Sequence, residues 1–319
     1  VEEKKDSVSL KKLYFNGGVK DDHGFTRLSF CYRKVGEGSE QNGELKTLNI
    51  PVSKSITQDN FYHFWDLSNF DLQPGDQFEY YFEISDNDGV NGPKASRSQK
   101  AFYKMPTLDE LSEKTDKTNE EIKADLEESI KKAKEIQKEI DALNKKLLDK
   151  KSVSWEEKKK LEDLLQKQKD LQKQVEEIKK ENQLNNEQKS EVSPQDENIM
   201  QKQMELEKLL ESLMNEELKK KLEEMQKLMD QLDKNEMQKE LEKMKLDSKD
   251  MEKELDRALE MFKQLQFEQK MQDNIKKLEE LSKKQDEQGN KTEDKKSDQK
   301  ENQENQDKLN KEFEDLKKD

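Results

Sequence analysis

The composition of the chain changes abruptly at residues 105–106, and this change constrains the fold more than any motif does. Residues 1–105 hold 16 of the 20 aromatic residues and nine of the ten glycines. The rest consists mainly of Lys, Glu, Gln, Asp, Leu and Met, and ten of the eleven methionines lie between Met200 and Met271. With 29% apolar and 43% charged residues, the chain lacks the apolar volume for a large globular core. We therefore predict an α+β protein: a compact β-domain over residues 1–106, then long helices.

The charge balance limits the possible partners. Residues 1–105 carry 14 basic and 16 acidic residues, so most of the formal net charge of −14 belongs to the helical region. Lysine runs alternate with glutamates, and no basic face is left to neutralise a phosphate backbone. We therefore expect protein partners and no nucleic acid. Cys31 is the single cysteine, which excludes an internal disulfide, and no apolar run approaches the roughly 18 residues of a membrane span.

The N-terminal region contains short segments in which apolar and polar residues alternate. In the clearest of them, Phe78, Tyr80, Phe82 and Ile84 share one face, which we assign to a core. Further strands are expected at 10–15, 25–32, 45–50, 62–66 and 98–105, separated by turns at 16–18, 36–43 and 86–92. Short strands at roughly ten-residue spacing predict an antiparallel β-sandwich.

Residues 72–80, with the sequence LQPGDQFEY, resemble the start of strand F in fibronectin type III domains, which has the pattern Leu-x-Pro-Gly-x-x-Tyr. Phe78 stands where that pattern has its corner tyrosine, so the hydroxyl that would bond to the backbone is missing. The resemblance implies a fibronectin type III or Ig-like sandwich. It leaves that one hydrogen bond without a donor.

The loop after this strand, DNDGVNGPK, is a weak candidate calcium site. Asp86, Asp88 and Asn91 would offer oxygen ligands to a hard cation. A simpler interpretation is a hairpin loop in which the Asn and Asp side chains bond to their own backbone, while Gly89 and Gly92 adopt positive φ. Apart from this possible Ca²⁺, we expect no cofactor and no metal.

No group of residues suggests catalysis. His23 and His63 are the only histidines, and neither has a Cys or a paired carboxylate at metal-ligand spacing. No Walker loop, G-x-S-x-G, H-E-x-x-H or C-x-x-C motif occurs. We therefore expect a protein that is not an enzyme.

Two capping boxes, at residues 107–110 and 154–157, predict the starts of two helices. Each helix carries a narrow apolar stripe at three- and four-residue spacing, which is typical of a coiled-coil contact. The stripes are Ile122, Leu126, Ile130, Ala133, Ile136, Ile140, Leu143 and Leu147, and Leu161, Leu164, Gln168, Leu171, Val175 and Ile178. Residues 107–185 are therefore predicted to form an antiparallel coiled-coil hairpin with Trp155 packed across its tip. A linker is expected at 186–198.

A second, Met-rich hairpin is predicted over residues 199–285. Residues 206–232 should pack against 251–281, with breaks at 233–235 and 247–248 and a short bridging helix at 237–246. Methionine either replaces leucine in this contact or forms an adaptable groove for partner proteins. The candidate interaction residues are Met225, Met229, Met251, Phe262 and Leu265. Residues 286–319 form a polar tail for which we expect disorder or an isolated helix.

Three strings resemble an uncharacterised family of large envelope proteins from the Bacteroidota. They are YYFEISDNDGVNGPK at 80–94, SWEEKKKLEDLLQKQKDLQKQVEEI at 154–178 and LDRALEMFKQLQFEQK at 255–270. In that family, membrane-spanning helices precede β-domains and long coiled coils. The resemblance implies a cell-envelope protein, on the periplasmic side of a membrane, and brings no catalytic residues. Because the chain begins at Val1, we expect a processed or excised piece whose membrane attachment lies in a segment absent from it.

Three functional hypotheses follow. The leading one is a structural or scaffolding protein of the cell envelope that binds partners through its helices and its β-domain, with self-association as a further possibility. The second is a holdase-type chaperone that cradles clients between helical hairpins. The third is a Ca²⁺-dependent adhesion or ligand-binding module.

Overall fold

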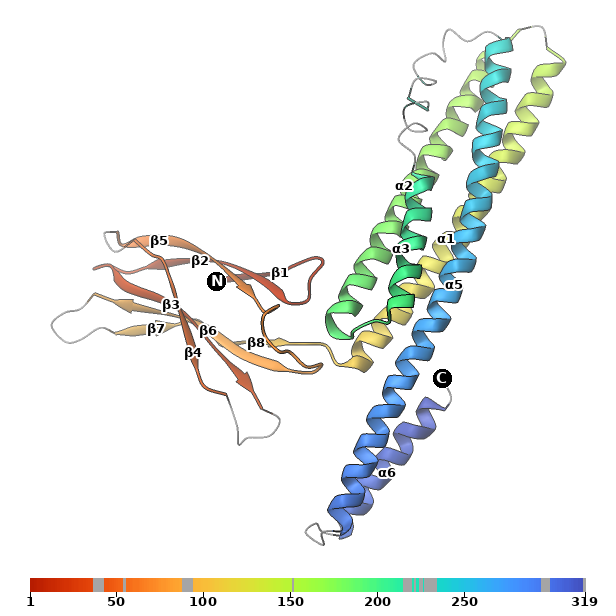
Figure 1. The fold of residues 1–319 in the computed structure, drawn as a ribbon. Coiled ribbons are helices and arrows are strands. Elements are labelled where there is room, and N and C mark those ends of the chain that lie inside the picture. Colours follow the sequence, from red (N-terminus) through yellow and green to blue (C-terminus); the bar gives the residue numbers. More distant parts are fainter. Residues whose placement is uncertain are drawn as a thin grey trace. The chain divides into compact units, whose positions relative to one another are not determined.

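A computed structural model describes residues 1–36, 43–53, 56–87, 94–150, 152–214, 220, 222–223, 226, 234–293 and 299–317. Antiparallel strands are followed by helices, so the predicted α+β class is confirmed (Figure 1). The chain divides into two compact units. Unit 1 comprises Val1–Ile122 and Lys180–Gln195, and unit 2 comprises Lys123–Lys179 and Asp196–Asp319.

The strands of unit 1 form two antiparallel sheets. Their bounds are β1 Glu2–Lys5, β2 Lys12–Lys20, β3 Phe25–Val35, β4 Lys46–Ile50, β5 Gln58–Asp66, β6 Gln77–Asp86, β7 Ala95–Arg97 and β8 Ala101–Lys104. The first sheet has the order β1-β2-β5. The second has the order β4-β3-β6, and both β7 and β8 pair with β6.

The two sheets bury aromatic side chains in one shared core. The ring of Phe15 on β2 lies 5.6 Å from the ring of Phe30 on β3 and 5.3 Å from that of Phe82 on β6, between centroids. Such tilted and edge-on contacts suit the ring quadrupoles. The predicted inward face of β6 is confirmed, because the core contains Phe78, Tyr80 and Phe82 with Ile84 packed against them.

The structure corrects the prediction of a turn at residues 16–18. Gly17 and Gly18 lie within β2, where Gly17 is opposite Phe61 of β5. A Cβ added to Gly17 would lie 2.5 Å from a ring carbon of Phe61, so glycine is required here by a close side-chain approach within the sheet. Two short strands, β1 and β7, were not predicted because their residues are exposed and show no alternation.

The helices have the bounds α1 Leu108–Leu148, α2 Trp155–Val192, α3 Glu197–Leu213, α5 Lys234–Glu293 and α6 Gln299–Leu316. The predicted capping box before α1 is confirmed, since the Thr107 amide donates to the Glu110 carboxylate at 2.9 Å and the Glu110 amide donates to the Thr107 hydroxyl at 3.2 Å. Both bonds satisfy donors that a helix start would otherwise leave unpaired. No described helix combines the length and apolar character needed to cross a membrane.

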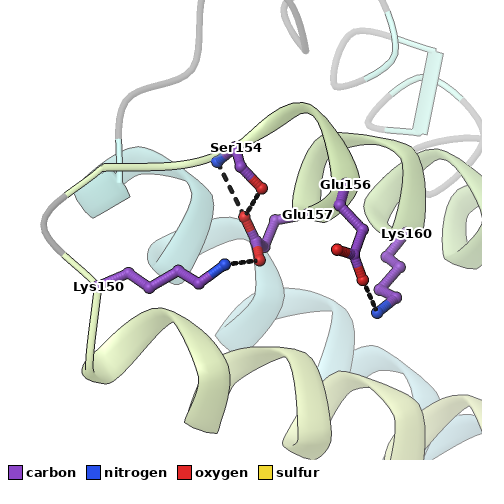
Figure 2. A network of polar contacts seen from close by, with 5 residues as sticks. All are labelled: Lys150, Ser154, Glu156, Glu157 and Lys160. Atoms are coloured by element: carbon purple, nitrogen blue, oxygen red, sulfur yellow. Dashed lines mark hydrogen bonds and ion pairs between the residues drawn. The ribbon is translucent and has the colours of Figure 1, made fainter.

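The helix start predicted from residues 154–157 is confirmed, since α2 begins at Trp155 (Figure 2). The Ser154 amide donates to the Glu157 carboxylate at 2.8 Å, and the Ser154 hydroxyl and the Lys150 ammonium donate to the same carboxylate. The neighbouring Glu156 pairs with Lys160 at 2.8 Å. The predicted packing of Trp155 across this tip is wrong. Its side chain is 75% exposed, because Glu157 fills the inward position.

In unit 2, α1 and α2 lie side by side and run antiparallel (Figure 1). Glu139 pairs with Lys167 at 2.6 Å, and Lys132 donates to Gln174 at 2.8 Å. Every residue of the two predicted apolar stripes is buried. Narrow stripes therefore pack together without a broad core, as their spacing predicted.

The predicted second hairpin is present in part, because α3 packs against α5 and Lys202 pairs with Glu268. Part of the predicted partner segment at 206–232 lies outside the described residues, and the prediction is wrong in two respects. First, α5 is one continuous helix, with neither a break at 247–248 nor a separate helix at 237–246. Second, α5 packs on the first helical pair: the Ser248 hydroxyl donates to the Ala133 carbonyl at 3.1 Å, and Lys245 pairs with Asp141 at 2.6 Å. The physical reason is that one narrow helix pair leaves apolar edges exposed, and a third helix covers them.

The chain is helical in segments predicted to be irregular. The helix α2 continues to Val192, inside the predicted linker. In the predicted polar tail, α5 extends to Glu293 and α6 folds back along it, with Lys284 paired to Glu312 at 3.0 Å and Gln288 bonded to Asn302 at 3.0 Å. The described part of the tail is therefore held by polar side-chain pairs and is not an isolated helix.

Candidate functional site

Of the three weak calcium candidates, Asp86 alone belongs to the described residues, and Asp88 and Asn91 lie outside them. Asp86 ends β6. Its carboxylate accepts the Lys94 amide at 2.8 Å, and its own amide donates to the Lys94 carbonyl at 3.0 Å. These bonds close the strand pair on either side of the loop, which is the behaviour expected of an Asp in a turn.

The turn between β2 and β3 lies beside Asn87 and carries three potential metal ligands. The ligand atoms of Asp21, Asp22 and His23 lie within 4.8 Å of one another. The Asn87 side chain donates to the His23 carbonyl, which ties the end of β6 to this turn. The side chains of Asp22 and His23 are 84% and 80% exposed, and the hydrogen bond from His23 lowers the pKa of the Asp22 carboxyl. We assign no metal ion to this exposed group.

The other histidine and the cysteine are structural. The His63 ring lies 4.6 Å from the ring of Phe30 and 6.2 Å from that of Phe15, and burial lowers the pKa of His63. An imidazole among aromatic rings contributes to packing. Cys31 is buried on the opposite face of β3, with its Sγ 3.8 Å from the Thr47 hydroxyl. The Tyr81 hydroxyl is also a hydrogen-bond neighbour of Cys31.

The predicted interaction residues lie in two places. Met251, Phe262 and Leu265 are buried in unit 2 on α5, where the Met251 sulfur accepts a hydrogen bond from Gln168 at 3.7 Å. Met225 and Met229 lie outside the described residues. The three described residues thus pack within the helical unit and do not form a surface.

An exposed apolar stripe follows them along α5. Its members lie at four-, four- and three-residue spacing, and we call it the α5 stripe: Phe267, Met271, Ile275 and Leu278. Their exposed fractions are 67%, 53%, 50% and 44%. On a helix this spacing places them on one face. Large apolar side chains exposed together mark interaction sites more often than isolated ones do.

The predicted helix contact over residues 251–281 includes the α5 stripe, which the structure leaves exposed. A signal for the difference is present in the sequence. Apolar residues recur every three or four positions up to Leu265, and the next apolar residue, Phe267, follows after only two positions. That step does not match the helical repeat, so the apolar residues move to another face of the same helix.

No family model, curated protein or solved structure matches this chain. Its function must therefore be inferred from its own residues.

The α5 stripe is continuous with an existing helix contact. At its C-terminal end, Leu278 and Leu281 line a hollow together with Leu309 and Phe313 of α6. On the flank of this contact, Lys284 of α5 pairs with Glu312 of α6 at 3.0 Å. An amphipathic helix thus already occupies the same face of α5. This arrangement can bind a second helix further along the face, without any covalent chemistry.

A second hollow, of about 540 Å³, lies between α1 and α2. Its apolar lining comes from Ala142, Leu143 and Leu164, and its rim carries Lys146 and Lys160. The neighbouring Lys160 lowers the pKa of the Lys146 ammonium. An apolar floor with a mixed charged rim is the usual cross-section of an exposed helix pair, and we assign no ligand to it.

Proposed function

We propose that this chain is a non-enzymatic scaffolding protein of the cell envelope that binds partner proteins through its helices. The observation that carries this proposal is the α5 stripe. Its four apolar side chains are between 44% and 67% exposed on one face of a long helix. The occupant we propose is an amphipathic helix of a partner protein, packed against α5 as α6 is.

The finer fold assignment belongs to the same proposal. We propose that the two sheets of unit 1 form a fibronectin type III or Ig-like sandwich. The division of the eight described strands into a β1-β2-β5 sheet and a sheet built on β3 and β6, around one aromatic core, supports this assignment. We also propose that α1 and α2 form a coiled-coil hairpin, supported by their antiparallel ion pairs and buried narrow stripes.

The location in the cell envelope, with membrane attachment through a segment absent from this chain, is proposed from the resemblance to the Bacteroidota envelope family. The absence of an enzymatic role is proposed from the residues that catalysis would need. His63 packs among aromatic rings, and Cys31 is buried. Catalytic acids and bases require accessible groups with tuned pKa values.

Site-specific photo-crosslinking tests the proposed partner surface. A benzoyl-phenylalanine placed at Met271 in the chain, expressed in its own cells, should yield a discrete cross-linked product. A matched probe at Lys253, on the same helix and 63% exposed, should yield none. Sequencing of the captured peptide should show apolar residues that recur every three or four positions. Identical products at both positions, or capture of α6 alone, would contradict the proposal.

A second variant distinguishes binding at the α5 stripe from a chance cross-link to a nearby protein. Ile275→Glu places a charge in the middle of the α5 stripe, where Ile275 is 50% exposed, so the fold should be retained. The cross-link at Met271 should then be lost. If the cross-linked product is a second copy of this chain, the α5 stripe mediates self-association, and the proposed partner helix is wrong.

A holdase-type chaperone is the second candidate, favoured by exposed methionines. Met200 and Met204 of α3 and Met271 of α5 are 52%, 55% and 53% exposed. Flexible thioether side chains adapt to varied apolar segments. A holdase would suppress aggregation of a model client at equimolar ratio, and Met271→Lys would weaken that activity. A scaffold would leave the aggregation of the client unchanged.

A further inference from the structure

The outer face of the β1-β2-β5 sheet carries three aromatic side chains that lie outside the core. They are Tyr14 of β2 and Tyr62 and Phe64 of β5, and the side chains between them along each strand point into the core. Tyr62 is 57% exposed and Phe64 is 39% exposed. The strand register places Tyr14 directly opposite Phe64, so the three side chains gather at one place on this face.

The three rings form an ordered row. The Tyr14 ring lies 5.0 Å from that of Phe64, at 24° between the planes, and 6.3 Å from that of Tyr62, at 29°. Tyr14 is thus the middle ring. Its hydroxyl donates to the Asp6 carboxylate at 3.1 Å, a bond that raises the pKa of Tyr14. The anchored middle ring holds the two outer rings in place, and their free surfaces face solvent.

Neutral polar groups border the row on the side of Tyr62. In the strand register Asn16 lies opposite Tyr62, and the next position on the same face pairs Gly18 with Asn60. A Cβ added to Gly18 would lie 3.2 Å from the Asn60 amide oxygen, so the glycine leaves room for that side chain. An amide both donates and accepts hydrogen bonds. Beside the exposed Tyr62 ring there are therefore two amides and an open position.

The charges on this face are balanced in sign. Lys4 lies opposite Tyr14, and Glu2 lies opposite Asn16. At the other end of the row Lys12 faces Asp66. Asp6 at the Tyr14 hydroxyl adds a third acid, and Lys20, two positions beyond Gly18 on the same face, adds a third base. Acids and bases are therefore equal in number, and the face has no net attraction for a charged ligand.

We propose that this aromatic face binds a neutral saccharide chain. A sugar ring has an apolar C–H face, which packs against the electron-rich face of an aromatic ring. Its hydroxyl groups each donate and accept hydrogen bonds, as do the amides of Asn16 and Asn60. Tyr62 is the principal stacking residue, and the two amides fix the orientation of the sugar hydroxyls.

Two other ligand classes fit this face less well. A protein interface excludes charged residues from its centre, whereas here Lys4 and Asp66 lie within one or two strand positions of the rings. Single-stranded nucleic acid also stacks on aromatic rings, but it requires a basic groove along its backbone. The balanced charges of this face and the net charge of −14 oppose that requirement.

Titration of the full chain with neutral oligosaccharides tests the proposal. The probes are soluble hexasaccharides of β-1,4-glucan, β-1,3-glucan, N-acetylglucosamine and mannose. Their binding is measured by isothermal calorimetry and by tyrosine fluorescence. At least one should bind at millimolar concentration or below. Tyr62→Ala should weaken that binding by about tenfold or more, the loss of one stacked ring. Asn60→Ala should weaken it by a smaller factor.

The matched control is Phe102→Ala. Phe102 lies on β8 in the other sheet and is 60% exposed, so its loss should leave the affinity unchanged. Circular dichroism checks that each variant is folded. The proposal is overturned if no saccharide of the panel binds, if Tyr62→Ala binds as the unmodified chain does, or if oligothymidine or a helical peptide binds this face more tightly than any saccharide.

Discussion

Glu191, on the last turn of α2, accepts a hydrogen bond from the hydroxyl of Ser9 at 2.5 Å, and its second carboxylate oxygen accepts the amide of Leu10 at 2.6 Å. The next residue, Val192, packs against the aromatic core of the two sheets. The Tyr103 hydroxyl donates to the Leu10 carbonyl at 3.0 Å. The C-terminal end of α2 is therefore part of unit 1, although the sequence separates it from the strands by the whole of α1.

We expect Glu191→Ala to destabilise unit 1. The change removes a charged acceptor of two hydrogen bonds, and each such bond contributes about 1.5–3 kcal/mol. Urea unfolding followed by tryptophan fluorescence would measure the loss through Trp65 of the core. The control is Glu187→Ala, one turn earlier and exposed, which should change the free energy of unfolding by less than about 0.5 kcal/mol. Equal effects of the two variants would contradict the role of Glu191.

The features that sequence predicted correctly are local ones. The helix starts after Thr107 and Ser154 need only residues three apart, and the inward face of β6 needs only alternation along one strand. The contact between Ser9 and Glu191 joins residues 182 positions apart, so no local pattern marks it. The α5 stripe is an intermediate case. The two-residue step from Leu265 to Phe267 carries the signal, but only the packing of α5 shows which of its faces is covered.

Ser248 explains why the predicted break in α5 does not occur. A serine after Asp247 resembles a helix start, but here the Ser248 side chain is fully buried and donates to the Ala133 carbonyl of α1 at 3.1 Å. Ser248→Leu should overpack this contact and cost about 1–3 kcal/mol in the free energy of unfolding. Lys249→Leu, at the exposed neighbouring position, should cost less than about 0.5 kcal/mol. Thermal unfolding of both variants would measure the two costs. Equal costs would contradict the buried contact of Ser248 with α1.

Asn119 and Asn185 form a buried amide pair within unit 1. The Asn185 side chain donates to the Asn119 side chain at 2.9 Å, and the two residues are 5% and 8% exposed. Each single change to Leu leaves one buried amide without this partner and should cost about 1–3 kcal/mol. The double variant should cost less than the sum, by at least about 0.5 kcal/mol, because no amide is then left alone. Additive costs in a double-mutant cycle would show that the pair is not coupled.

Glu157 should make the stability of the helical unit depend on acid pH. Its carboxylate accepts hydrogen bonds from Lys150 and from Ser154 (Figure 2), which lower the pKa of Glu157 from its usual 4.5 to about 2. A carboxyl with a depressed pKa stabilises the folded state above its usual pKa, and that contribution is lost as the pH falls from about 4.5 to about 2.

Glu157→Gln removes this contribution. We expect it to lower the free energy of unfolding by roughly 2 kcal/mol at pH 7, and by progressively less as the pH falls toward 2. Urea unfolding of both chains between neutral pH and the lowest pH at which they remain folded would measure the narrowing difference. Glu156→Gln is the matched control, because Glu156 pairs only with Lys160 in Figure 2 and its side chain is 68% exposed. A difference that stays constant with pH, or one that Glu156→Gln reproduces, would show that the buried carboxylate at this helix start does not carry the effect.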